Sequence, residues 1–209
     1  MSTRTRSLLL SALLPSALFG QSLGIHNHRG GIISLGVRSS ISAFNHGEWN
    51  NTGTGVGGQL RVQLADRVNT DWFFDYLSGN IGDFAHREDL HIGWSVLFYV
   101  LEPGQEQRLF QPYVLAGHCF DRSLQKANED PSIRAERWSS AVQAGIGAHI
   151  NLSERSDLSL VSQYMIHLGA DIHADQHEGE VEFHEEGGSD LEGHLLFHLS
   201  FNYKLFDLW

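Results

Sequence analysis

The residues best suited to chemistry form an acidic, histidine-rich segment at 171–192. Imidazole and carboxylate groups bind ions such as Zn²⁺, Cu²⁺ or Ni²⁺. His173 and His177 are four residues apart, a metal-ligand spacing if the backbone there is helical, whereas Glu180, Glu182 and His184 alternate with apolar residues and would share a face on a strand. We favour a hydrated acidic loop and expect no cofactor; the alternative is a weak divalent-cation site. The candidate ligands are His173, His177, Glu180, Glu182 and His184.

A second set of residues could activate a nucleophile. His198 and Ser200 are two residues apart, and Glu192 precedes them. A serine becomes nucleophilic when a histidine accepts its proton and an acid orients that histidine. The chain has no phosphate loop, cysteine metal cluster or dinucleotide fingerprint. Cys119 is its only cysteine, which excludes an intramolecular disulfide.

These residues sit within a repeated pattern of strands. Eight stretches alternate apolar and polar side chains, as strands between two different environments do. They are residues 30–41, 54–65, 69–78, 89–101, 108–120, 136–150, 157–169 and 190–206. The links after the second, fourth and sixth stretches are short, and the other links are longer and more polar. This pattern predicts an all-β fold, an eight-stranded antiparallel up-and-down transmembrane β-barrel with short turns in the periplasm and long loops outside the cell.

The two faces of each stretch predict which side meets lipid. The apolar rows are rich in Leu, Val and Phe, and the polar rows carry Gly, Ser, Gln and His rather than the Lys and Glu of a soluble sheet. We therefore expect the apolar rows to face lipid and the polar rows to fill the lumen, with basic groups paired to Asp. The lumen candidates are Arg38, Arg61, Asp71, Asp75, His91, Gln143, His149, Gln163, His167, His198 and Lys204. Such a network is either a structural polar core, the interpretation we favour, or a gate or proton-linked site.

The N-terminus and the composition agree with export to a membrane. Residues 1–22 combine Arg4 and Arg6 with a short apolar run and a small-residue cleavage site, which predicts a secretory signal peptide. The barrel domain is then 23–209. The net charge of −11 argues against binding of nucleic acid.

Three segments carry a resemblance to a known group. They are QPYVLAGHCFD (Gln111–Asp121), the glycine-rich strand, turn and strand of 141–169, and the aromatic-ended HLLFHLSFNYKLFDLW (194–209). The chain resembles the small eight-stranded outer-membrane β-barrels of Gram-negative bacteria, of the OmpA-transmembrane and OmpX type. The resemblance implies a cell outer-membrane location, contact with lipids and lipopolysaccharide, and recognition of the last strand by the barrel-insertion machinery.

The resemblance implies no single function, because relatives serve as anchors, adhesins, small pores and lipid-modifying enzymes. Relatives that deacylate lipid A carry a His-x-Ser element before the last loop, where this chain has His167-Leu168-Gly169 and no nucleophile. We predict a non-enzymatic protein with a structural or surface-interaction role through its outer loops, whose external ligand the sequence does not name. The alternatives are a narrow porin-like channel and, less favoured, a lipid A-modifying enzyme.

Overall fold

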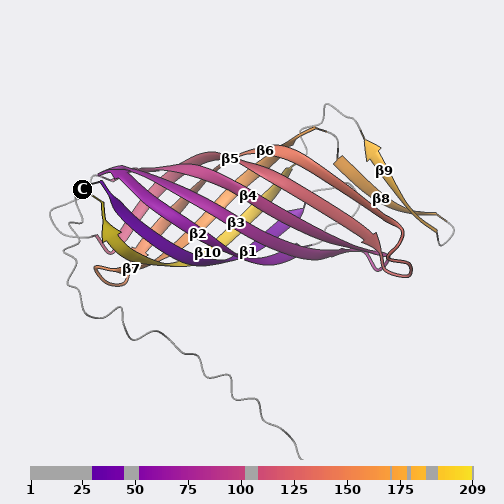
Figure 1. Cartoon of the computed structure of the whole chain (residues 1–209), viewed down its shortest axis with the longest axis horizontal. Coiled ribbons are helices and arrows are strands. Elements are labelled where there is room, and N and C mark those ends of the chain that lie inside the picture. The colour runs from indigo at the N-terminus through magenta and orange to yellow at the C-terminus, as the bar shows by residue number, and fades with distance from the viewer. Residues whose placement is uncertain are drawn as a thin grey trace, which may run out of the picture.

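The computed structural model describes residues 30–44, 52–101, 108–169, 171–177, 180–186 and 193–208. Eight of its strands close into one antiparallel barrel in the order β1-β10-β7-β6-β5-β4-β3-β2 (Figure 1). Their bounds are β1 (Ile32–Phe44), β2 (Thr52–Ala65), β3 (Val68–Ile81), β4 (Ala85–Tyr99), β5 (Phe110–Ala127), β6 (Arg134–Asn151), β7 (Ser156–Leu168) and β10 (Gly193–Asp207). Every strand pairs with its sequence neighbours in the barrel, and β1 also pairs with β10, so the predicted up-and-down barrel is confirmed.

The barrel wall is apolar outside and polar inside. On β1, for example, Val37 is 68 % exposed and Arg38 is 8 % exposed, although the two are adjacent in sequence. The outward rows of the other strands are likewise large and apolar, with Phe74, Ile92 and Leu199 among them. This arrangement is that of a barrel surrounded by lipid, and a soluble barrel reverses it. Within the described ranges, no helix is long and apolar enough to cross a membrane.

The strands β3 to β6 extend further than the sequence pattern predicts. Residues 82–84 alone join β3 to β4, and residues 128–133 join β5 to β6, whereas the link between β4 and β5 covers 100–109. The predicted contrast between short and long links is therefore wrong at these positions. Its physical reason is that above the apolar belt the outward side chains become polar, so the alternation fades while the ladder continues. Gly82, at φ 54, provides the left-handed backbone of the tightest of these turns.

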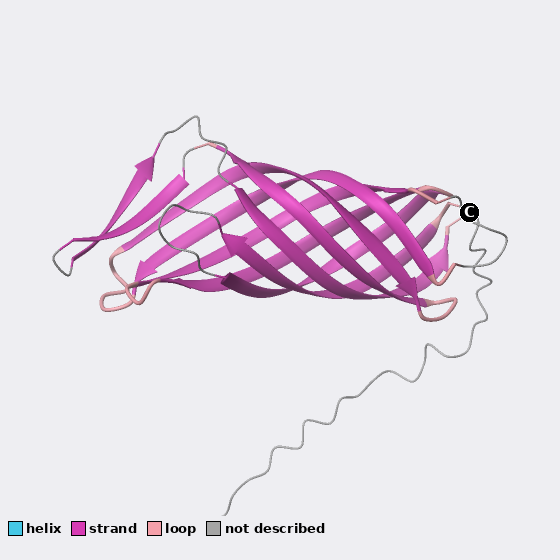
Figure 2. Cartoon of the chain, turned by 180° about the vertical axis from the view of Figure 1, so that it is seen from behind, coloured by secondary structure: helices cyan, strands magenta, loops and turns pink. Residues whose placement is uncertain are grey.

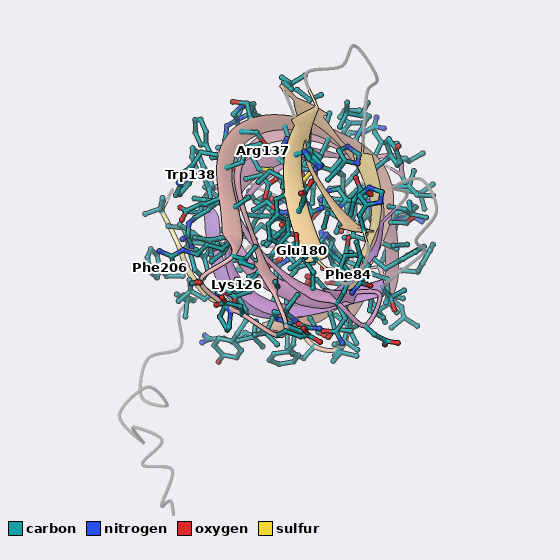
Figure 3. All side chains as sticks on the ribbon, turned by 90° about the vertical axis from the view of Figure 1, so that its right-hand side faces the viewer. Phe84, Lys126, Arg137, Trp138, Glu180 and Phe206 are labelled. Atoms are coloured by element: carbon teal, nitrogen blue, oxygen red, sulfur yellow. The ribbon has the colours of Figure 1, made fainter. Side chains whose placement is uncertain are left out.

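The remaining two strands form a hairpin across one end of the barrel. β8 (Asp171–His177) and β9 (Glu180–Glu186) pair only with each other, between β7 and β10 in the chain. Figure 2 shows the hairpin beyond the barrel end opposite the C-terminus, and Figure 3, viewed from that end, shows it lying in front of the barrel opening. Its apolar side chains pack onto the β3–β4 turn. The cluster there comprises the buried Ile81, Ala85 and Ala174, with the half-buried Phe84 and Phe183 packed against them. The hairpin thus covers the mouth of the lumen.

Candidate functional site

The lumen near the end that carries the C-terminus is organised around one arginine. Arg61 of β2 donates from Nε to Asp71 Oδ1 at 2.9 Å and from Nη1 to Asp157 Oδ1 at 3.1 Å. Its Nη2 donates to Ser159 Oγ at 2.9 Å. Asn202 of β10 adds a fourth strand by donating to Asp157 at 2.9 Å. This network joins strands on opposite sides of the barrel, and Arg61 is buried within it. Lys204, half-buried, and the buried His149 lie at the same level, with His149 Nδ1 3.7 Å from Asp157 Oδ1.

The middle of the lumen holds an ion pair, an amide chain and a small cavity. Arg38 Nε lies 3.0 Å from Asp75 Oδ1, with its guanidinium over the ring of Phe73. Gln163 donates to Gln143 at 2.8 Å, and Gln143 donates to Ser95 at 2.8 Å. The cavity has about 20 Å³. That volume holds roughly one water molecule. Its polar lining includes Arg38, Gln59, Ser95, Gln163, His198 and Ser200.

An apolar cluster fills part of the lumen between the polar groups. Its members are Phe73, Leu77, Cys119, Ala141, Met165 and Leu196, all buried. The sequence analysis did not foresee this cluster, because each strand contributes only one or two apolar residues to an otherwise polar row. Leu196 between His194 and His198 was the signal that could have revealed it, since a large apolar residue on a lumen row needs apolar neighbours.

A second charged network lies beneath the hairpin and is centred on Asp121 of β5. His91 Nε2 lies 3.2 Å from Asp121 Oδ1, and His167 Nδ1 lies 3.0 Å from Asp121 Oδ2. Arg137 Nη2 is 3.8 Å from the same Oδ2. His167 Nε2 is 2.5 Å from the Nε2 of His194. Four strands thus bring three imidazoles and one guanidinium to the neighbourhood of a single buried carboxylate.

Several of the central residues were absent from the predicted lumen set. They are Arg87, Asp89, Asp121, Arg137, Asp157 and His194, all buried. Asp89, Arg137, Asp157 and His194 lie within the predicted stretches, whereas Arg87 and Asp121 lie just outside them, where the strands of the structure continue further than predicted. Arg87 illustrates this, because it precedes the predicted start of its strand at residue 89 and donates to Asp89 at 2.8 Å. The predicted residues Arg38, Arg61, Asp71, Asp75, His91, Gln143, Gln163 and His198 are placed in the buried interior, and Lys204 is half-buried.

The predicted metal ligands share one face of the hairpin. In its register His173 pairs with His184, Asp175 with Glu182, and His177 with Glu180. Ile172, Ala174 and Phe183 occupy the other face, toward the barrel. On the charged face, His184 Nε2 lies 3.3 Å from Glu182 Oε2. Within the described part of the chain, no three His, Cys, Asp or Glu side chains converge closely enough to hold a metal ion.

The candidate catalytic pair does not form. His198 Nδ1 lies 2.7 Å from Ser40 Oγ on the neighbouring strand, so its hydrogen bond goes to Ser40 rather than to Ser200. Both His198 and Ser200 point into the filled lumen and are buried. Glu192, the proposed acid, lies outside the described residues.

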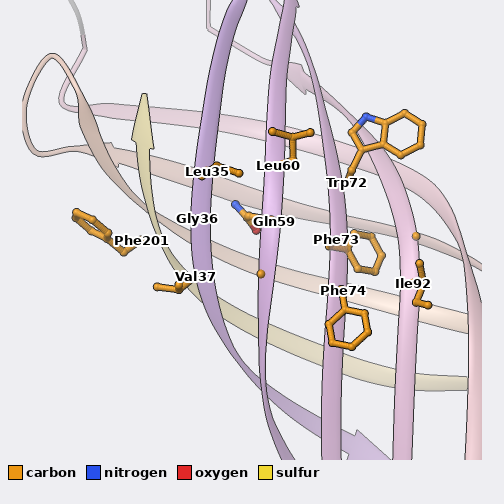
Figure 4. Close-up of a pocket in the computed structure, with 12 residues that line it drawn as sticks. Leu35, Gly36, Val37, Gln59, Leu60, Trp72, Phe73, Phe74, Ile92 and Phe201 are labelled. Carbon is orange, nitrogen blue, oxygen red and sulfur yellow. The ribbon is translucent and has the colours of Figure 1, made fainter. Parts of the chain in front are cut away.

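The outer wall carries a depression rather than a closed pocket. Figure 4 shows its apolar side chains, among them Trp72, Phe74 and Phe201, projecting from neighbouring strands. The depression has about 660 Å³ and is lined mainly by apolar groups. Gly36, Gly58 and Gly93 also line it. In a bilayer this surface faces acyl chains.

Comparison with protein-family models finds no match, and comparison with curated proteins also finds none. Solved structures do match. Neisserial surface protein A is 12 % identical, with 82 % of this chain and 96 % of that one covered and a TM-score of 0.54. The outer membrane protein AlkL, solved in DMPC bilayers, is 15 % identical, with 100 % and 98 % covered and a TM-score of 0.50.

A major outer membrane protein from Thermus thermophilus is 11 % identical, with 82 % of this chain and 98 % of that one covered and a TM-score of 0.50. The chain has the fold of the small outer-membrane β-barrels. At these identities the likeness establishes the architecture of the barrel. The side chains that fill this barrel must therefore be interpreted from its own geometry.

Proposed function

We propose that this chain is a non-enzymatic integral protein of the Gram-negative outer membrane, with a structural or surface-interaction role through the hairpin over its mouth. The observation that carries the proposal is the filled lumen. Paired charges occupy its two ends, an apolar cluster lies between them, and the cavity beside Arg38 and His198 has room for roughly one water. A barrel whose lumen is packed with side chains favours a structural or surface-interaction role over the passage of solutes or ions.

The proposal includes the surroundings of the barrel. Lipids and lipopolysaccharide contact its apolar belt, and the barrel-insertion machinery engages the last strand, β10. The predicted signal peptide, residues 1–22, lies outside the described residues. The hairpin end is placed outside the cell, because the C-terminus of such barrels lies in the periplasm and the hairpin is at the opposite end (Figure 1). Outer-membrane fractionation and heat-dependent gel migration test this placement, and recovery of a soluble secreted product contradicts it.

Single-channel recording separates this role from that of a narrow channel. The refolded barrel, inserted into planar bilayers, is expected to show no steady unitary currents. A deletion of residues 171–191 serves as the matched variant, because it uncovers the mouth while leaving the packed lumen in place. Silence of both proteins supports the proposal. Reproducible ion currents from the intact barrel overturn it and favour the porin-like alternative.

A lipid assay addresses the enzymatic alternative. Incubation of the refolded barrel with lipid A is expected to leave the acyl pattern unchanged, because Ser200 is buried and His198 is bonded to Ser40. A shortened acyl pattern that disappears in Ser200→Ala refutes the non-enzymatic assignment.

A further inference from the structure

The β8–β9 hairpin has one strand edge that no described strand covers. β9 pairs with β8 on one side, and no other strand in the described part of the chain pairs with its second side. The companion strand β8 faces the barrel, because it contacts β6 and its Ile172 carbonyl accepts a hydrogen bond from the Gln125 side chain at 2.9 Å. The outer edge of β9 therefore offers backbone N–H and C=O groups to a further strand.

The sequence and geometry of β9 leave this edge open to pairing. Proteins commonly guard a sheet edge with proline, lysine or a β-bulge, each of which hinders the addition of another strand. β9 (Glu180–Glu186) contains neither proline nor lysine, and its register with β8 has no bulge. Figure 2 shows the hairpin extending beyond the end of the barrel wall. An extended chain from outside can therefore reach the edge.

The face of the hairpin that points away from the barrel carries uncompensated negative charge. Glu180, Glu182 and His184 alternate along β9 on this face, and the side chains of Glu182 and His184 are 56 % and 51 % exposed. Asp175 of β8 lies directly opposite Glu182 in the register. Like charges in that position destabilise a sheet. Residues 171–186 contain no Lys or Arg to offset them, so a positive charge from outside would be stabilising here.

The face of β9 that points toward the barrel is apolar and only partly covered. Val181 and Phe183 are half-buried, and Phe183 packs on the cluster at the β3–β4 turn. Phe84 of that turn is half-buried beside the same cluster. Successive side chains of an added strand would alternate between the two faces of the hairpin. Every second residue of such a strand could therefore bury apolar surface next to Val181 and Phe183.

The two faces together select the kind of strand that fits the edge. Basic residues on the outward face would meet Glu180 and Glu182, and apolar residues on the inward face would pack beside Val181 and Phe183. A second copy of β9 fits poorly, because its carboxylates would lie beside those of the first copy and like charges repel. Charge complementarity therefore favours a basic partner over self-association.

We propose that the outer edge of β9 is a docking site for an extended peptide segment in which basic and apolar residues alternate. The segment adds a third strand to the hairpin. Backbone hydrogen bonds supply affinity, and the alternating side chains supply specificity. The proposal rests on the surface-interaction role proposed above and adds the chemistry of the partner. It requires no movement of the barrel wall.

Binding of a synthetic peptide tests the site. The probe is a capped peptide of alternating Lys and Val, with a neutral dye and the seven-residue length of β9, added to the refolded barrel in phosphatidylcholine nanodiscs. Fluorescence anisotropy should show saturable binding that empty nanodiscs lack, and hydrogen exchange should slow at the amides of β9. Two control peptides should not bind. One carries Glu in place of Lys, and the other is N-methylated at every residue, which keeps the charge and removes the backbone donors.

Substitutions in the barrel locate the charge. The double variant Glu180→Gln, Glu182→Gln loses two cross-strand pairs with the peptide, so its affinity should fall about 2- to 30-fold. The matched variant Asp66→Asn, Glu154→Gln changes the net charge equally in exposed turns at the other end of the barrel and should bind as the original does.

Three results overturn the docking site. They are the absence of saturable binding, equal binding of the N-methylated peptide, and equal loss of affinity in both double variants. Self-association of the intact barrel in sedimentation, lost on deletion of residues 171–191, assigns the edge to a second copy and also overturns it. Each of these results leaves the bilayer recordings and the membrane fractionation unchanged, so failure of the docking site is distinguishable from failure of the proposed function.

Discussion

Removal of the Arg61 guanidinium should destabilise the barrel far more than removal of a surface arginine. Arg61 donates hydrogen bonds to two buried carboxylates and one buried hydroxyl. Breaking a buried ion pair by deleting one partner costs about 3–5 kcal/mol, because the remaining charge is left without compensation. Arg61→Met leaves Asp71 and Asp157 in that state, so its free energy of unfolding should fall by at least that amount.

Arg122 provides the matched control. Its Nε donates to Glu136 Oε1 at 2.7 Å, as short as any contact of Arg61, but the two side chains are 32 % and 45 % exposed. Ion pairs in contact with water contribute about 0–1 kcal/mol. Arg122→Met should therefore leave the free energy of unfolding nearly unchanged. The contrast between the two variants isolates burial from hydrogen-bond length.

Urea titration of the refolded barrel, followed by tryptophan fluorescence in detergent or lipid vesicles, measures both values. Neutralising the orphaned acids in the triple variant Arg61→Met, Asp71→Asn, Asp157→Asn should recover most of the loss, because no buried charge is then unpaired. If Arg61→Met and Arg122→Met lose equal stability, or if the triple variant is less stable than Arg61→Met, the electrostatic account of the lumen is refuted.

Three further predictions concern other parts of the molecule. Leu196→Ala should lower the free energy of unfolding by about 2–5 kcal/mol, because Leu196 lies at 0 % exposure in the lumen cluster; a loss below about 1 kcal/mol in urea titration contradicts close packing there. Hydrogen bonds from the Ser132 hydroxyl and backbone amide hold the pKa of Asp130, in the β5–β6 turn, below its ordinary value. Their stabilising contribution is present above that ordinary pKa and is lost as the pH falls through the lowered one. Ser132→Ala should raise the pKa of Asp130 in an NMR titration, and an unchanged value argues against the hydrogen bonds. The alternative of a weak Zn²⁺, Cu²⁺ or Ni²⁺ site on the hairpin face predicts calorimetric heat that falls when His173, His177 and His184 are replaced by Gln; no heat from the intact barrel ends that hypothesis.

The sequence predicts the barrel because lipid and lumen impose opposite demands on neighbouring residues. Val37 and Arg38 show the pattern in one step, and it recurs on every strand. The prediction weakens where lipid ends, since β5 continues to Ala127 although two of its three outward residues beyond Phe120, Arg122 and Lys126, are charged. Outside the apolar belt, the strands end where the backbone hydrogen bonds of the ladder end. These bonds require no alternation of apolar and polar side chains, so the sequence carries no periodic signal there.

The candidate site was predictable in type but not in pairing. Alternation indicates that Arg61 and His91 face the lumen, yet it does not state which strand lies opposite across the barrel. The contact of Arg61 with Asp157 joins residues 96 positions apart, and closure of β1 on β10 is what brings their strands together. For the same reason the meeting of His167 with His194 across the hairpin connection has no local signature.

The part of the wall that rises above the apolar belt has a consequence for how deeply the barrel sits. Two pairs of its outward charges neutralise one another, with Lys126 Nζ 2.7 Å from Glu88 Oε1 and Arg122 Nε 2.7 Å from Glu136 Oε1. These pairs offer little net charge to the headgroup layer. The immersion depth is then governed by the height of the apolar belt, and it should follow bilayer thickness while remaining indifferent to ionic strength.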